Sequence, residues 1–564
     1  MKKEPWYWLN DNSRAFLARG YLMEGQTAEE RVRQIAETAE EILKKPGFAD
    51  KLVDYTSRGW VSFSSPVWAN FGAGRGLPIS CFGSYIADDM ASILYTNAEV
   101  GMMSKYGGGT STYFGALRER GAAISDKGSS NGPVTFMQLF NTMVDVVSQG
   151  SVRRGNMAAY LPIEHPDAKE FLDIGTEGNP IQGLTHAVTV GDEWLQAMVD
   201  GDEDKRALWA KVIQRRGEIG YPYIMFTDNA NNHTVDVYKD KDLKIHASNL
   251  CSEIMLPSKD DWSFVCCLSS INVLWYDDWK DTDLVETMTY FLDAVMEEFI
   301  TKLELMRDSG NHEKEEAFHF MERAYNFAKA NRALGLGVLG YHSLLQEKML
   351  AFDSEEAAQL NIEVFTHMHE QSYAASEAMA KEYGEPEVLE GYGRRNTTTM
   401  AIAPTTSSAF ILGQVSQGIE PVWSNCYIKD VAKMKVTIKN PFLEALLEEK
   451  GENNRETWNS IRDNDGSVQH LKCLSDEEKA VFRTFAEVDQ NAVIDQAAAR
   501  QQFIDQGQSL NVMVPPSVSP KDINALYMRA WKGGVKALYY QHSMNAAQEL
   551  TRQKLSKKDS DEDS

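Results

Sequence analysis

Sulfur, carboxylate and amide side chains stand close together in the stretch SNLCSEIMLP, at residues 248–257. Cys251 lies two positions from both Asn249 and Glu253. A thiol beside a carboxylate can act as a nucleophile whose proton the carboxylate accepts, although such a pair usually includes a histidine. The one histidine close in sequence is His246. The first interpretation is therefore a nucleophilic cysteine with Glu253 as its base.

Two distant stretches bring further sulfur: PISCF contains Cys81, and FVCCLSSINV contains Cys266 and Cys267. A second interpretation needs three cysteines to converge in the fold. One would abstract a hydrogen atom as a radical, and two would supply electrons by becoming a disulfide. Any one cysteine alone is more often a small buried apolar side chain. Six cysteines, without a CxxC pair or a Cys/His cluster at zinc spacing, predict neither a disulfide scaffold nor a metal site.

Three segments could approach phosphate. The Gly-rich segment 104–124, with Arg118 and Arg120, lets backbone N–H groups come close to an anion, but it lacks the GK[ST] ending of a P-loop, so a flexible loop is an equal interpretation. APTTSSAFILG (403–413) opens an apolar helical run with hydroxyl residues, which suits either a phosphate site or an ordinary N-cap. GLGVLG (335–340) follows a charged helical stretch, so a helix stop with close backbone packing is favoured over a dinucleotide site.

The elements that position these residues alternate between helix and strand patterns. TAEERVRQIAETAEEILKK predicts a helix with Thr27 as N-cap, Glu30 at the capping-box position and one apolar face. Residues 133–150 predict a helix that ends at a glycine cap, and long helical patterns dominate 285–380. Short β-like runs such as HAVTV, INVLW and TTTMAIAP lie between them. This alternation indicates an α/β fold.

The totals restrict the class of protein. The chain has 564 residues and a net charge of −25, which disfavours general nucleic-acid binding, since that needs a basic footprint. No apolar run is long enough to span a membrane, and the N-terminus lacks the apolar region of a signal peptide. We expect a cytoplasmic protein without membrane or DNA partners. The adjacent Tyr539 and Tyr540 in KALYYQHS are either core and surface of a strand or a pair of stacked, redox-active phenols.

Five motifs in order give a resemblance that runs from WLNDNSRAFLARGYL to ALYYQHS. They are PISC, GGGxxxxxxALR, SNLCxEIxLP, RNTTTMAIAPTTSS…GIEP and LYY. The set resembles the catalytic (large) subunit of ribonucleotide reductase, class I type. The resemblance implies a ten-stranded α/β barrel of two five-stranded half-barrels with a cysteine finger loop inside. We expect a helical segment at 1–60, the barrel domain at 61–548 and a disordered charged tail at 549–564.

The resemblance also implies roles. Cys251 would be the thiyl radical, Glu253 the general base and Asn249 a ribose ligand, while Cys81 and Cys266 match the reducing pair; Cys267 has no counterpart. Tyr539 and Tyr540 match a pair that relays a radical from a separate, metal-containing, ferritin-like small subunit. No metal is expected in this chain. The residues that match substrate contacts are Ser65, Ser80, Thr405, Thr406, Ser407 and Ser408.

Effector control is implied by Asp88, Lys105 and Arg118, which match a site for a deoxynucleoside triphosphate such as TTP, or for ATP. Residues 175–185 match a mobile loop that carries effector identity to the substrate base, and the helix 133–148 would form a homodimer interface. A thioredoxin- or glutaredoxin-like protein would be the reductant.

Two departures from the family pattern qualify these expectations. The chain begins almost directly at the core, so we expect no N-terminal ATP cone and no dATP off-switch of that domain. The C-terminal cysteine pair is missing: the reductant reaches Cys81 and Cys266 directly, or Cys426 or Cys473 relays electrons, or the sequence is truncated. The alternatives are an adenosylcobalamin-dependent (class II) reductase, which does not need the tyrosine pair, and an inactive nucleotide-binding protein.

Overall fold

The first half of a barrel is formed by five parallel strands. The computed structural model describes residues 3–147, 155–431, 434–515 and 517–543. Neighbouring strands in this half pair in parallel in the order β2, β3, β6, β7 and β8. Their bounds are Cys81–Tyr85, Gly109–Tyr113, Met157–Pro162, Thr185–Val190 and Tyr223–Phe226.

The second half joins three named strands to two extended segments. β9 (Phe264–Asn272) and β10 (Leu334–Leu339) are parallel. β10 bridges in parallel to Met400, Ile402 bridges in parallel to Gln508, and Tyr539 N donates to Leu510 O at 2.9 Å. Beyond this, β13 (Val512–Val514) runs parallel to β15 (Gln541–Ser543). Thus 399–402 and 506–512 act as strands between β10 and β14 (Ala537–Leu538).

The two halves meet in antiparallel fashion on both sides. β2 pairs antiparallel with β9, and β14 pairs antiparallel with β8, which closes the ring. Eight named strands and the two extended segments make ten members, five in each half. The expected barrel of two five-stranded half-barrels is therefore confirmed.

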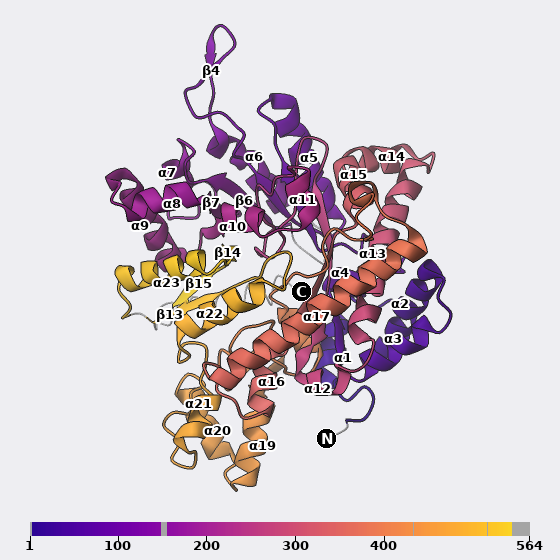
Figure 1. Cartoon of the computed structure of the whole chain (residues 1–564), viewed down its shortest axis with the longest axis vertical. Coiled ribbons are helices and arrows are strands. Elements are labelled where there is room, and N and C mark those ends of the chain that lie inside the picture. Colours follow the sequence, from indigo (N-terminus) through magenta and orange to yellow (C-terminus); the bar gives the residue numbers. More distant parts are fainter. Residues whose placement is uncertain (1–2, 148–154, 432–433, 516, 544–564) are drawn as a thin grey trace.

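Helices cover the outside of the barrel (Figure 1). All nine residues of β9 are buried, because one face points into the barrel and the other packs against α13 and α15. The longer helices around the barrel are α5 (Met90–Lys105), α6 (Pro133–Val146), α8 (Asp192–Val199), α9 (Glu203–Ile219), α13 (Leu284–Arg307), α14 (His312–His319), α15 (Glu322–Asn331), α16 (Tyr341–Glu347), α17 (Glu355–Tyr383), α22 (Gln490–Gln501) and α23 (Pro520–Lys532). Short helices are α4 (Ser65–Asn70), α7 (Ala168–Phe171), α10 (Thr227–Asn232), α11 (Asp236–Asp240), α12 (Tyr276–Trp279) and α18 (Thr406–Ile411).

The N-terminal region is helical, as expected. It contains α1 (Asp11–Leu17), α2 (Ala28–Leu43) and α3 (Phe48–Ser57), after which β1 (Val61–Phe63) pairs antiparallel with the end of β9. The capping box of α2 is confirmed: Glu30 N donates to Thr27 Oγ1 at 3.2 Å, and Thr27 N donates to Glu30 Oε2 at 3.1 Å. Whether 1–60 forms a unit of its own stays a prediction.

Two expectations for single elements had different outcomes. GLGVLG forms β10 and its following turn, and a Cβ at Gly337 would lie 2.7 Å from Ala401 O, which confirms the close-packing interpretation. The helix α6 ends at Val146, so its predicted length to a glycine cap was wrong; Gly150 itself lies outside the described residues. Val147 is already extended, which ends the helix. The predicted tail at 549–564 also lies outside the described residues.

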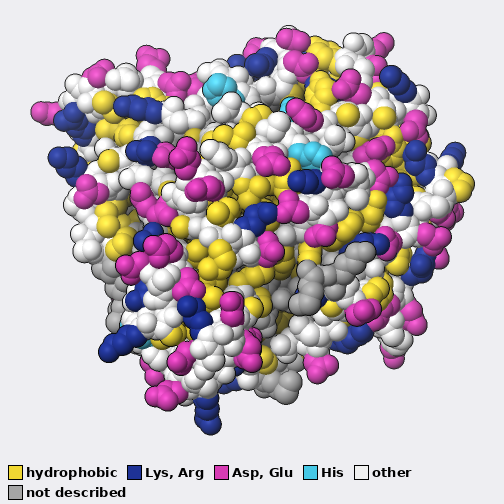
Figure 2. All heavy atoms as spheres, turned by 60° about the horizontal axis from the view of Figure 1, so that its bottom comes forward, with side chains coloured by type: hydrophobic (Ala, Val, Ile, Leu, Met, Phe, Trp, Pro, Cys, Tyr) yellow, Lys and Arg dark blue, Asp and Glu magenta, His cyan; other side chains and the backbone are white. Residues whose placement is uncertain are grey.

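A projection with its own apolar core extends from the barrel, at the bottom of Figure 1. It consists of the hairpin β11 (Cys426–Val431) and β12 (Met434–Lys439), followed by α19 (Pro441–Glu449), α20 (Arg455–Asp463) and α21 (Asp476–Val481). A second hairpin, β4 (Ala123–Ile124) and β5 (Gly128–Ser129), protrudes at the opposite end. Figure 2 shows acidic, basic and apolar side chains interspersed on the face it presents. Among the described residues, every helix is too short or too polar to cross a bilayer.

Candidate active site

Cys251 lies on an irregular loop inside the barrel, residues 248–257, which we call the finger loop. Backbone oxygens of this loop accept hydrogen bonds from both half-barrels: Tyr160 Oη donates to Asn249 O at 2.6 Å, Ser509 Oγ to Cys251 O at 2.5 Å, and Gly507 N to Glu253 O at 2.8 Å. Bonds from opposite walls place the loop between them. Ser252 has a φ of 66°, in the left-handed region, so the chain turns sharply just after the half-buried Cys251.

The three predicted cysteines converge. Cys81 and Cys266 are directly opposite each other across the antiparallel pair β2–β9. Opposed Cα atoms in such a pair are about 4.5–5.5 Å apart, within the range for a disulfide. Asn249 Nδ2 donates to Cys81 Sγ at 3.1 Å, which ties the finger loop to this pair. Both thiols are free and buried.

Burial decides the protonation state of the pair. It raises the pKa of Cys81 well above the ordinary thiol value, and the nearby Glu253 and Cys251 raise it further. Burial also raises the pKa of Cys266, while the bond that Gln506 Nε2 donates to its Sγ at 3.4 Å has the opposite effect. Both groups are therefore thiols that carry hydrogen. They suit a reaction in which electrons and protons leave together.

Glu253 is 1% exposed, and the pKa of its carboxyl group is close to neutral pH. Burial raises its pKa to about 7, against the lowering effect of bonds from Asn249 and Ser509. Ser509 Oγ donates to Glu253 Oε2 at 3.0 Å. A carboxyl with this pKa can both accept and return a proton at physiological pH.

Tyr539 and Tyr540 pack against each other with their rings tilted by 53°, so they are in contact but not stacked. Their ring centroids are 4.5 Å apart, and the side chain of Tyr539 also interacts with the Cys251 thiol. Burial and Cys251 raise the pKa of Tyr539, and burial raises that of Tyr540 to about 12, so both phenols hold their protons. Tyr539 is thus the tyrosine whose side chain bonds to Cys251, and a radical relay through the pair stays a prediction.

The predicted phosphate-binding residues Thr405, Thr406, Ser407 and Ser408 lie together at the start of α18. Thr405 has a φ of 47° and precedes α18, where Thr406 is exposed and Ser407 half-buried. Ser408 Oγ donates to Phe63 O at 3.3 Å, so this segment lies beside the start of α4, which contains Ser65.

Two serines of the predicted set have different surroundings. Ser65 Oγ accepts from Tyr21 Oη at 3.3 Å. Ser80 precedes Cys81 and has a buried hydroxyl without a hydrogen-bond partner, which a ligand hydroxyl or phosphate would satisfy.

A family model supplies the decisive observation. The model of the ribonucleotide reductase barrel domain matches residues 79–205, 197–388 and 385–541. The chain belongs to the ribonucleotide reductase family. Its cysteine finger and two half-barrels are those of the reductase barrel, as the resemblance implied.

Relatives and a solved structure agree with the large subunit of the enzyme. A protein of Frog virus 3 (isolate Goorha), named as a ribonucleoside-diphosphate reductase large subunit, is 36% identical over 88% of each chain. The large subunit of that name from Invertebrate iridescent virus 3 is 30% identical over 87% of each chain. The solved structure of the Actinobacillus ureae class Id ribonucleotide reductase alpha subunit superposes with a TM-score of 0.90 and a sequence identity of 55%. The match covers 96% of this chain and 99% of that subunit's chain.

The predicted effector residues of this reductase are only partly brought together. Arg118 Nε lies 2.8 Å from Asp88 Oδ2, both exposed on the surface. Lys105 Nζ lies 3.6 Å from Glu313 Oε1 of α14, so Lys105 forms its ion pair with Glu313 and not with Asp88. In the 175–185 loop, Gly183 N donates to Asn141 Oδ1 of α6 at 2.8 Å.

Several residues of the reductase site were missed from sequence. Tyr160 and Ser509 bond to the finger loop, and Gln506 bonds to Cys266. The ring centroid of Tyr223 lies 4.8 Å from that of Tyr539 and 5.1 Å from that of Tyr540. The alternation of the tyrosines in YPYIMF at 221–226 was a usable signal for Tyr223. Nothing local in the sequence distinguished the other three.

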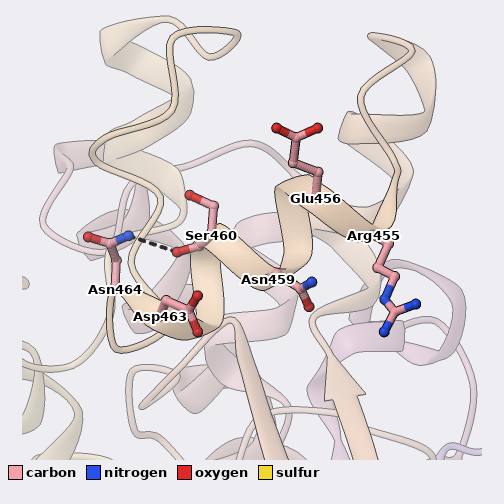
Figure 3. A pocket seen from close by; sticks show the side chains of 6 residues that line it. All are labelled: Arg455, Glu456, Asn459, Ser460, Asp463 and Asn464. Atoms are coloured by element: carbon pink, nitrogen blue, oxygen red, sulfur yellow. Dashed lines mark hydrogen bonds between the residues drawn. The ribbon is translucent and has the colours of Figure 1, made fainter.

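A surface hollow of about 640 Å³ lies on the projection, along α20. Figure 3 shows its lining, in which Asn464 Nδ2 donates to the backbone oxygen of Ser460 at 2.8 Å. The residues lining it are Arg455, Glu456, Asn459, Ser460, Asp463 and Asn464. They contain neither a thiol nor any residue of the finger loop, so we assign the chemistry to the barrel.

Proposed function

We propose that this chain reduces ribonucleotides, as diphosphates, to 2′-deoxyribonucleotides by radical chemistry at Cys251. The observation that supports this best is the meeting of three thiols and one carboxyl inside the barrel. Cys251, as a thiyl radical, takes the hydrogen from the ribose 3′ carbon. Glu253 accepts the 3′-hydroxyl proton, and the 2′-hydroxyl leaves as water. Cys81 and Cys266 give two electrons and two protons and become a disulfide, after which Cys251 returns the hydrogen to the 3′ carbon.

Each residue has a physical reason for its part. An S–H bond is comparable in strength to the activated C–H bond, so abstraction at Cys251 is reversible. The amide of Asn249, already bonded to Cys81, is in place to hold a ribose hydroxyl near the thiols. The buried barrel interior excludes water and stray hydrogen donors from a radical.

The radical would enter through the tyrosine pair from a ferritin-like, metal-containing small subunit. We expect partner-dependent reduction, and replacing Tyr540 by phenylalanine should lower it at least about 100-fold, because phenylalanine lacks the phenolic hydrogen that is lost in the relay. The measurement is deoxynucleotide formation by the chain with the candidate small subunit, without it, and with adenosylcobalamin instead. The matched control is Tyr427→Phe, at a tyrosine of β11 that is 40% exposed.

These arms separate the candidate functions. Reduction with cobalamin alone, unaffected by Tyr540→Phe, would establish the class II alternative. Nucleotide binding without reduction under every condition would establish the inactive nucleotide-binding protein.

The carboxyl of Glu253 predicts a specific pH dependence. Its pKa is raised to about 7, and a general base must be ionised, so the rate of reduction should increase as pH rises through about 7. Replacement by glutamine should lower the rate at least about 100-fold and remove this acidic limb from what remains. The measurement is kcat/KM from pH 5.5 to 8.5 for both proteins. An unchanged acidic limb in Glu253→Gln would assign it to another group.

Substrate choice and assembly complete the proposal. Ser65, Ser80 and Thr405–Ser408 would bind the substrate and its diphosphate, and Asp88, Lys105 and Arg118 would bind a dNTP or ATP effector. Lys105 would have to leave Glu313 to do so. A homodimer would form through α5 and α6, which expose Met90, Leu94, Leu139 and Val146. A thioredoxin- or glutaredoxin-like reductant and a cytoplasmic location stay predictions.

A further inference from the structure

The loop 416–423, the linking loop, lies between the Thr405–Thr406 segment and Tyr540. Its two ends are fixed to the barrel, because Gly340 N donates to Ser416 O at 2.8 Å and Val422 N donates to His342 Nδ1 at 2.7 Å. In the middle of the loop, Tyr341 N donates to Gly418 O at 3.4 Å, a longer bond than those at the two ends.

One side of the linking loop contacts the predicted phosphate-binding segment. Gly418 N donates to Thr405 Oγ1 at 2.7 Å, and Thr406 Oγ1 donates to Gln417 Oε1 at 3.3 Å. Gly418 has a φ of 46°, and a Cβ there would lie 3.0 Å from Ala403 O, so the two segments approach closely. A phosphate that takes the Thr405 and Thr406 hydroxyls competes with these bonds.

The other side contacts the outer tyrosine through a buried carboxyl. Glu420 is 5% exposed; its Oε2 accepts from Trp423 Nε1 at 2.9 Å, and its Oε1 accepts from Asn511 Nδ2. The amide oxygen of Asn511 in turn accepts from Tyr540 N at 3.1 Å. Burial raises the pKa of Glu420 to about 7, and the two bonds lower it. The bonds from Trp423 and Asn511 thus stabilise the ionised form of the Glu420 carboxyl.

We propose that Glu420 is a positioning residue for radical transfer, which links the Thr405–Thr406 segment to the placement of Tyr540 through Asn511. This rests on the proposed function. A nucleotide phosphate at the segment would shift the linking loop, and the shift would pass by hydrogen bonds to the Tyr540 backbone and change its contact with Tyr539. The relay would then conduct best when substrate is bound.

The first test is Glu420→Gln. In either orientation of the new amide, its NH₂ group faces another donor, Asn511 Nδ2 or Trp423 Nε1, so one bond is lost. We expect partner-driven kcat to fall at least about tenfold, with substrate Kd by direct titration changed less than about threefold. With 3-fluorotyrosine at position 540, the ¹⁹F resonance should shift on adding a ribonucleoside diphosphate in the parent chain and not in Glu420→Gln.

The second test is a charge swap, Glu420→Gln with Asn511→Asp. The glutamine oxygen can accept from Trp423, its NH₂ can donate to the new aspartate, and the other aspartate oxygen can accept from Tyr540 N. This restores every bond of the link, so kcat should return to within about threefold of wild type, together with the ¹⁹F shift. The matched control is Glu298→Gln, at a partly buried carboxyl of α13 that accepts from Gly72 N and pairs with Lys302, which should leave kcat and the ¹⁹F shift unchanged.

The outcomes separate this inference from the proposed function. A wild-type chain that reduces no nucleotide with its small subunit overturns both. An active wild type with Glu420→Gln equally active, or with its ¹⁹F shift intact, overturns the inference alone. A loss in Glu420→Gln that the charge swap does not restore, accompanied by a lower melting temperature, shows a structural role and also overturns it.

Discussion

Replacing Cys251 by alanine lowers nucleotide reduction to less than about one thousandth of the wild-type rate. The Cys251 thiol interacts with Tyr539, and in the proposed function it is the atom that takes the ribose hydrogen. Folding should change little, because the thiol is half-buried and the backbone oxygens of the loop accept bonds from Tyr160 Oη, Gly507 N and Ser509 Oγ. The measurements are deoxynucleotide formation with the small subunit, substrate titration and thermal melting.

Serine at position 251 distinguishes sulfur chemistry from packing. It keeps the size and polarity of the side chain but has an O–H bond too strong for reversible abstraction, so it should be as inactive as alanine. Both variants should still bind substrate. Activity retained in either of them would show that the reaction does not pass through this atom.

Replacing Cys266 by alanine should lower the rate of multiple-turnover reduction to less than about one hundredth of the wild-type rate. The reason is that Cys81 would then lack the partner it needs to form a disulfide. The matched control is Cys267→Ala. Cys267 is the next residue of β9, so its side chain points to the opposite face, where Asp293 and Arg332 of the outer layer affect its pKa. It should keep most of the activity.

A single-turnover experiment tests the same pair directly. Without an external reductant, the wild type should form at most one product per site, and mass spectrometry should find the peptides of Cys81 and Cys266 joined. A disulfide between other cysteines, or loss of activity in Cys267→Ala equal to that in Cys266→Ala, would contradict the assignment.

The sequence indicated the candidate site residues better than it indicated the contacts that hold them in place. Asn249, Cys251 and Glu253 lie within five consecutive residues, and the order of the motifs implied the barrel. The capping box of Thr27 was predictable because its partners are three residues apart. Local rules of this kind depend on contacts that the spacing itself specifies.

The contacts that anchor the site are long-range. Gln506 reaches Cys266 across 240 positions, and Ser509 reaches Cys251 across 258. No local pattern indicates which extended segments become neighbours when a barrel closes. The β-like run at 397–404 was therefore predicted without its neighbours, and the role of 506–512 was not predicted at all. The ion pair of Lys105 with Glu313 was missed for the same reason.

Cys81 and Cys266 face each other across the antiparallel pair β2–β9, where the first half-barrel meets the second. In the proposed cycle, each product formed leaves a Cys81–Cys266 disulfide between the two half-barrels, and the reductant breaks that disulfide again. A cross-link of this kind typically contributes about 2–4 kcal/mol to the free energy of unfolding. The spent enzyme would then be the more rigid form, and regeneration would loosen the walls around the next substrate.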